Sequence, residues 1–223
     1  VLPEGAVLKI PKELSFEQAA LMGCSVITGV GAVINAAKVK PGHTVAVFGA
    51  GGVGVNVVQG AVLSGAKAIV AVDRHPSRLD DAMTFGATHT INASDTDPVA
   101  AIRDLTGGRG VDYAFEAVGL SATIQQAYDC LAKRGIAMTL GIASTTTKVT
   151  ISPVGLVYEE RVLTGSLYGS AAPKTDIPMI IDLYTNGRLK LDALLSRTYA
   201  IEEINQAFDA MQSGETLRSV IKF

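Results

Sequence analysis

Three glycines and one carboxylate are the residues whose types and spacing suit the binding of a ligand. Gly49, Gly51 and Gly54 directly follow the apolar run 44–48, and Asp73 ends the next apolar run. Gly49 would allow a sharp turn, Gly51 a close approach of the backbone to a pyrophosphate, and Gly54 tight packing of a helix on a sheet. The helix N-terminus would offer unpaired N–H groups to the phosphates, and Asp73 would accept hydrogen bonds from both adenosine ribose hydroxyls. The spacing therefore predicts a dinucleotide site.

The same stretch has a second interpretation. Residues 45–66 carry no charged side chain, so their length and composition also permit a buried glycine-rich helix or a membrane span. Against this, the stretch contains the polar residues Asn56, Gln59 and Ser64, and strand-like runs flank it. These features favour a strand, a glycine turn and a helix.

The elements that must position these residues alternate between strand and helix along the chain. This alternation predicts an α/β fold with a doubly wound parallel sheet of the Rossmann type, in the order 3-2-1-4-5-6, with a few flanking helices. The expected strands of this sheet cover residues 44–48, 68–72, 88–91, 111–115, 136–140 and 162–168.

Three regions are expected in the domain organisation. Residues 1–22 contain a connector that is the remnant of a preceding domain, with a short helix over 16–21 opened by a Ser15 and Gln18 capping box. A second helix would end near Lys38. Residues 23–185 form the Rossmann domain, and residues 186–223 form a C-terminal segment with a helix over 201–213 and a terminal strand.

Composition narrows the class of protein. The 223 residues are 48% hydrophobic and carry a net charge of −2, which favours a buried α/β core and gives no broad basic surface for nucleic acid. The two cysteines are far apart and form no CxxC pair, which suits a reducing cytoplasm. No signal peptide is recognisable, and we expect no membrane partner. The missing initial Met indicates a fragment.

Seven stretches, in order and with matching spacing, resemble the C-terminal two-thirds of zinc-dependent medium-chain alcohol dehydrogenases. They are residues 23–31, 47–54, 72–73, 86–88, 112–119, 165–169 and 213–223. The resemblance implies an NAD-binding domain whose intact parent oxidises an alcohol to an aldehyde or ketone by hydride transfer to NAD. It also implies a homodimer that forms through strand 162–168.

The resemblance further implies roles for individual residues. Cys24 falls where the family has a ligand of its catalytic Zn²⁺. Thr28 is the candidate catalytic residue and, with Val53, would pack against one face of the nicotinamide. Backbone groups of Leu140, Ser166 and Tyr168 would hold the carboxamide, and Arg218 would contact the pyrophosphate. The remaining cofactor contacts are expected from Gly52, Arg74, Arg78, Val118, Gly141 and Ile142.

One departure from the family bears on function. The family's other two catalytic-zinc ligands, its proton relay and its four-cysteine structural zinc lobe precede this segment and are not found in these residues. A single thiol cannot hold four-coordinate zinc. The chain is therefore expected to bind NAD without turning over alcohol.

Two alternatives stay open. A zinc-free NAD(P)H quinone or enoyl reductase of the same superfamily is disfavoured by Cys24 and Asp73, since those reductases commonly use NADPH. A non-catalytic NAD-binding module is also compatible with the sequence. A turnover assay on the full-length parent distinguishes them. The identity of the alcohol stays open because the expected substrate pocket lies mostly outside these residues.

Overall fold

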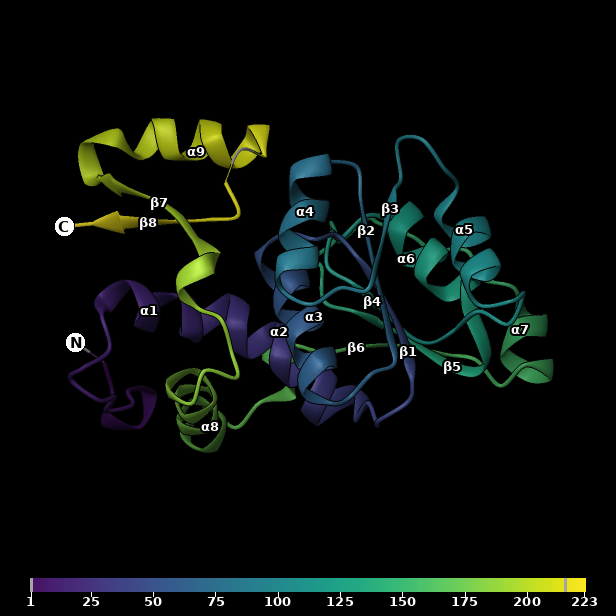
Figure 1. Ribbon diagram of the computed structural model, residues 1–223, viewed down its shortest axis with the longest axis horizontal. Coiled ribbons are helices and arrows are strands. Elements are labelled where there is room, and N and C mark those ends of the chain that lie inside the picture. Colours follow the sequence, from purple (N-terminus) through teal and green to yellow (C-terminus); the bar gives the residue numbers. More distant parts are fainter. Residues whose placement is uncertain (1, 215) are drawn as a thin grey trace.

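A six-stranded parallel sheet forms the centre of the molecule in this computed structural model, which describes residues 2–214 and 216–223 (Figure 1). Its order is β3-β2-β1-β4-β5-β6, which confirms the predicted Rossmann topology. Glu215, part of the last resemblance stretch, lies outside the described residues. The strands are β1 (Thr44–Phe48), β2 (Ala68–Asp73), β3 (His89–Asn92), β4 (Val111–Glu116), β5 (Leu131–Thr139) and β6 (Val162–Gly165).

Helices cover both faces of the sheet, which explains why every residue of β1 is buried. Figure 1 shows α3 and α4 on one side and α5 and α6 on the other. Along β1, Val45 and Val47 belong to the core beneath α3, whereas Ala46 and Phe48 belong to the core on the opposite face. The covering helices are α3 (Gly52–Leu63), α4 (Pro76–Thr84), α5 (Pro98–Leu105), α6 (Ser121–Asp129) and α7 (Pro153–Tyr158).

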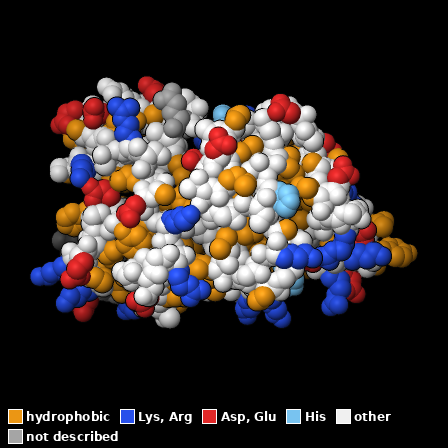
Figure 2. Space-filling model, in the orientation of Figure 1, with side chains coloured by type: hydrophobic (Ala, Val, Ile, Leu, Met, Phe, Trp, Pro, Cys, Tyr) orange, Lys and Arg blue, Asp and Glu red, His pale blue; other side chains and the backbone are white. Residues whose placement is uncertain are grey.

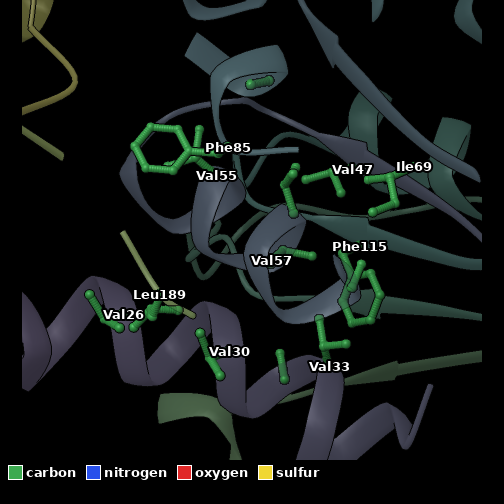
Figure 3. Packing of buried hydrophobic residues seen from close by; sticks show 14 of the residues in the cluster. Val26, Val30, Val33, Val47, Val55, Val57, Ile69, Phe85, Phe115 and Leu189 are labelled. Atoms are coloured by element: carbon green, nitrogen blue, oxygen red, sulfur yellow. The ribbon is translucent and has the colours of Figure 1, made fainter. Parts of the chain in front are cut away.

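The N-terminal helix is longer than the sequence predicted. α1 (Phe16–Leu21) opens on the expected Ser15 and Gln18 capping box and continues through a π-helical segment, Met22–Val26, into α2 (Ile27–Gly31). A second π-helical segment, Ala32–Ala37, ends this helix. The glycines do not break the helix, and Gly29 allows it to pack closely on α3, whose backbone a side chain at this position would overlap. Figure 3 shows Val30 and Val33 on the side of this helix that faces Val57 of α3.

This continuous helix crosses the boundary that the sequence predicted at residue 22, and the domain division itself stays a prediction. The helix Phe16–Ala37 is long and apolar enough to span a membrane by length and composition, although 56% of its most apolar window is buried in the protein. Residues 45–66 do not form a span, since they divide into β1, the glycine turn and α3.

The C-terminal segment forms a second, smaller layer (Figure 1). The helix predicted over 201–213 is a 3-10 turn, Ile201–Glu203, followed by the α-helix proper, and a strand that the sequence did not predict precedes it. Contact between Lys222 and Glu17 joins this layer to α1, and the Lys222 ammonium is the main reason why the pKa of Glu17 falls to about 2. The elements are α8 (Pro173–Thr185), β7 (Leu195–Ala200), α9 (Ile204–Ser213) and β8 (Arg218–Lys222), with β7 and β8 paired in parallel.

The prediction of a strand over residues 162–168 is wrong at its C-terminal end. β6 stops at Gly165, and Tyr168, Gly169 and Ser170 have φ angles of 54°, 69° and 48°. Left-handed residues cannot continue a strand. The chain instead turns back onto α2, where Gly169 lies against Gly31.

Charge is distributed without a dominant sign on the face shown in Figure 2. Basic and acidic side chains are interspersed with apolar ones, and no continuous basic surface covers this face. This distribution agrees with the small net charge of −2.

Candidate functional site

The glycine turn has the geometry that its spacing predicts. Gly49 has a φ of +90°, and its N–H donates to Val72 O at 2.8 Å, which holds the turn against the end of β2. Apart from the two chain neighbours of Gly51, no described residue comes within 4 Å of a Cβ built at this position, so the backbone is open there. Gly54 lies against the Gly49 carbonyl, and a Cβ on it would also be 3.4 Å from Val47 Cγ1 of β1. The three positions therefore differ in what they require: a positive φ, open space and close contact.

Asp73 has a fixed orientation at the end of β2. Its side chain belongs to a residue only 8% exposed, and its two oxygens accept from Ala50 N at 2.8 Å and His75 N at 3.0 Å. The Arg78 guanidinium lies 3.9 Å away. A carboxylate oxygen can accept more than one hydrogen bond, so Asp73 keeps lone pairs for a further donor.

A pocket of about 350 Å³ opens between the glycine turn, the end of β2, α6 and α9. Six of the predicted cofactor residues line it: Gly49, Gly51, Asp73, Arg74, Arg78 and Val118. The sequence did not single out the other nine lining residues, which are Phe48, Val72, His75, Ala93, Ala117, Leu120, Thr123, Gln126 and Gln212. The volume of this pocket lies within the range of small-molecule sites, about 300–1,000 Å³.

Two arginines fit an anionic group beside the glycine turn. The Arg218 guanidinium lies where a side chain at Gly52 would project, at the first residue of α3. The buried Nε atoms of Arg218 and Arg78 have no hydrogen-bond partner within the described residues. Burial lowers the pKa of the Arg218 guanidinium, and the charge of Arg78 acts in the same direction. A pyrophosphate would offer acceptors and negative charge to both, so these residues fit the predicted cofactor.

The predicted nicotinamide and zinc residues come from neighbouring helices. Gly29, next to Thr28 in α2, packs against the carbonyl of Val53 in α3, which brings the two predicted nicotinamide contacts to one helix crossing. Cys24 is exposed on the same long helix. Across the described ranges, no group of three or more His, Cys, Asp or Glu residues could hold a metal ion. These residues therefore do not fit a complete zinc site by themselves.

Glu116 joins the loops that follow β4 and β5, a role that its sequence context did not indicate. Its fully buried carboxylate accepts from Val118 N at 2.8 Å, Gly119 N at 2.7 Å and Thr123 Oγ1 at 2.8 Å. Its carbonyl accepts from Leu140 N at 2.7 Å and from Gly141 N at 3.0 Å. The predicted contacts Val118, Leu140 and Gly141 are thus held in one network, while Ile142 lies beside Gly119 and is largely exposed.

The predicted carboxamide contacts lie on the loops after β5 and β6. The N–H groups of Leu140 and Ser166 already donate to Glu116 O and Thr139 O, so only the carbonyls of these two residues would remain for the predicted carboxamide. The Tyr168 hydroxyl donates to Gly23 O at 2.8 Å, which fastens this loop beside Cys24. These residues do not line the pocket described above, so the predicted site divides into two halves.

The strand order and the glycine turn after β1 together define a Rossmann-type fold. The sequence profile described as zinc-binding dehydrogenase matches residues 52–186. The chain belongs to this zinc-binding dehydrogenase family and corresponds to the cofactor-binding region of zinc-dependent alcohol dehydrogenases.

Individual relatives agree with this assignment. The chain is 39% identical over its whole length to 61% of the alcohol dehydrogenase class-3 of Cereibacter sphaeroides. It is 37% identical to the S-(hydroxymethyl)glutathione dehydrogenase of Paracoccus denitrificans, again over its whole length and 61% of that protein. The solved structure of benzyl alcohol dehydrogenase from Acinetobacter calcoaceticus superposes with a TM-score of 0.93 at 37% identity, covering 97% of this chain and 59% of the other. The chain thus spans about three-fifths of the length of these relatives.

Proposed function

We propose that the chain is the NAD-binding part of a zinc-dependent alcohol dehydrogenase that oxidises an alcohol to an aldehyde or ketone. The observation that carries the proposal is the pocket that joins the open backbone at Gly51 to the oriented carboxylate of Asp73. When bound, the nicotinamide ring accepts a hydride from the alcohol carbon. A cytoplasmic setting is part of the proposal and is supported by the unpaired Cys24 and Cys130.

The residues of this chain bind and orient the cofactor. Asp73 accepts hydrogen bonds from the ribose hydroxyls, and the open backbone at Gly51 admits the pyrophosphate. Arg218 and the N-terminus of α3 supply positive charge. Thr28 and Val53 support one face of the nicotinamide. The carbonyls of Leu140 and Ser166 accept from the carboxamide, with the Tyr168 backbone alongside.

This chain should bind NAD yet form no NADH when alcohol and Zn²⁺ are added. The pocket supplies partners for phosphate and ribose, whereas Cys24 is the one metal ligand that the resemblance assigns to these residues. The test measures NAD binding by calorimetry and NADH by absorbance on one purified sample. Steady alcohol-dependent NADH formation would contradict the expectation that this chain is inactive. Failure to bind millimolar NAD would contradict the cofactor assignment.

Replacing Arg218 should weaken NAD binding much more than it changes apo stability. A charge-assisted hydrogen bond contributes about 1.5–3 kcal/mol, so Arg218→Ala should lower NAD affinity roughly ten- to hundredfold. Its apo melting temperature should change little, because Nε lacks a partner in the described structure. The matched control is Arg188→Ala, at an exposed position in the loop after α8. A large loss of apo stability with unchanged NAD affinity would show that Arg218 is structural.

We further propose that two copies pair through β6, the edge strand of the sheet. An uncovered edge offers unpaired backbone groups, and Val162 on this edge is 43% exposed. Val162→Lys should therefore convert a dimer into a monomer in analytical ultracentrifugation at micromolar concentration. Val62→Lys, at a 48% exposed position on α3, is the control and should remain dimeric. A wild-type monomer would contradict the proposal.

A further inference from the structure

The loop after β6, residues 166–170, packs on the helix Phe16–Ala37 instead of extending the sheet. Its Gly169 lies so close to this helix that an added Cβ would overlap the carbonyl of Ile27 and come within 3.1 Å of Thr28 O. Under the proposed function, on which this inference rests, the loop holds the carboxamide and Thr28 supports a face of the nicotinamide. The contact between loop and helix therefore sets how these two supports lie relative to each other.

Side-chain hydrogen bonds fasten this part of the chain to the helix on both sides of the contact. Before it, the Tyr168 hydroxyl donates to Gly23 O at 2.8 Å. After it, Asn35 Nδ2 donates to Asp176 Oδ2 at 3.0 Å, and the same oxygen accepts from Ala172 N at 2.8 Å. The Tyr168 bond thus fixes the side of the loop that carries the predicted carboxamide contacts.

The backbone of Tyr168 gives this hydroxyl a cost to offset. Its φ angle of 54° lies in the left-handed region, which is disfavoured for a residue with a large side chain. The preceding Leu167 is 85% exposed and adds little packing that would hold the loop. A strained residue persists where its surroundings fix it, and the bond from Tyr168 to Gly23 is one such contact. Without the hydroxyl, a larger share of the molecules should release the loop.

We propose that the Tyr168 hydroxyl is a positioning group for the nicotinamide end of the cofactor. Its bond to Gly23 O holds the backbone of Ser166 and Tyr168 against Thr28, so that the carboxamide and the ring meet their partners together. The phosphate and adenosine contacts belong to the separate pocket, which Tyr168 does not line, and do not depend on this bond.

The first test compares two ligands that differ at the nicotinamide. Tyr168→Phe removes the hydroxyl and keeps the ring, and calorimetry measures its binding of NAD and of ADP-ribose, which lacks the nicotinamide. NAD affinity should fall about fivefold, the usual contribution of one hydrogen bond, while ADP-ribose affinity stays within about twofold. Tyr158→Phe makes the same change at an 80% exposed position of α7 and should alter neither affinity.

The outcomes separate this inference from the proposed function. Unchanged NAD affinity in Tyr168→Phe, or an equal loss for NAD and ADP-ribose, overturns the positioning role and leaves the proposed function intact. A merely structural hydroxyl would give the equal loss. Absence of NAD binding by the wild-type chain overturns the proposed function itself.

The second test follows the loop without any ligand, by hydrogen–deuterium exchange. Ser170 N donates to Leu167 O at 2.9 Å within this loop, so exchange of its amide reports release of the loop. Tyr168→Phe should speed exchange in residues 166–170 about fivefold, and Tyr158→Phe should leave it unchanged. Equal exchange in the wild type and Tyr168→Phe would show that the hydroxyl does not hold the loop, which contradicts the positioning role.

Discussion

Gly54→Ala should abolish measurable NAD binding and destabilise the fold by about 3 kcal/mol, the upper part of the usual range for overpacking. The added Cβ would overlap the backbone carbonyl of Gly49, and a Cβ is fixed in place by the backbone that carries it. This overlap can be relieved only if α3 moves away from β1 or the turn at Gly49 opens. Either movement displaces the N–H groups that would face the pyrophosphate. Thermal unfolding and NAD calorimetry measure the two effects.

Gly51→Ala is the matched control, since it adds the same methyl group two residues beyond Gly49. Gly51 has extended φ and ψ angles of −73° and −172°, and no described residue other than its chain neighbours comes within 4 Å of the added Cβ. The apo fold should keep its stability or gain slightly, by about 0.4–1 kcal/mol, because the unfolded chain loses freedom. NAD binding should nevertheless fall, since the methyl group occupies the space of the pyrophosphate. Similar losses of stability in the two variants would contradict this account of the turn.

The second large effect is expected at Asp73, which should make the wild-type chain prefer NAD over NADP by at least about tenfold, or 1.4 kcal/mol. The carboxylate is held by Ala50 N and His75 N and cannot turn away from a 2′-phosphate. Two negative groups in contact at a protein surface repel by up to about 4 kcal/mol. Arg74 and Arg78 also line this pocket and offset part of that repulsion.

Asp73→Ala should therefore lower NAD affinity at least about tenfold and leave NADP affinity equal or higher, because the two arginines then face the 2′-phosphate unopposed. Loss of the acceptors for Ala50 N and His75 N should also reduce apo stability by about 1–3 kcal/mol. Asp80→Ala, at an exposed position of α4, is the control for charge. The comparison requires calorimetry with both cofactors on all three proteins. Equal wild-type affinity for NAD and NADP would contradict the role of Asp73.

The sequence alone was sufficient for features whose partners are close in the chain. The turn between β1 and α3 depends on residues 49–54, and the φ of +90° at Gly49 follows from a local need that glycine meets. The strand order was also predictable, because alternating strands and helices with right-handed crossovers leave few arrangements for a parallel sheet. The resemblance of seven stretches then identified the family.

Only the tertiary structure decided features that depend on contacts between distant segments. The long N-terminal helix contains Gly29 and Gly31 because α3 and the turn at Gly169 pack so closely against it that a side chain at either glycine would overlap them. β6 ends early for the related reason that its following loop turns back onto α2. Such contacts leave no periodic signal in the sequence.

The same distinction applies to the residues of the candidate site. Asp73 was predictable because it ends β2, the first strand after the glycine turn and α3. Gln212 was not, since α9 comes from the other end of the chain and reaches the pocket only in the folded molecule. The direction of the Thr123 hydroxyl depends on Glu116, to which it donates, and the carbonyl roles proposed for Leu140 and Ser166 depend on where their N–H groups already donate. A sequence supplies the donors and acceptors, but tertiary packing decides which of them are used within the protein and which remain for a ligand.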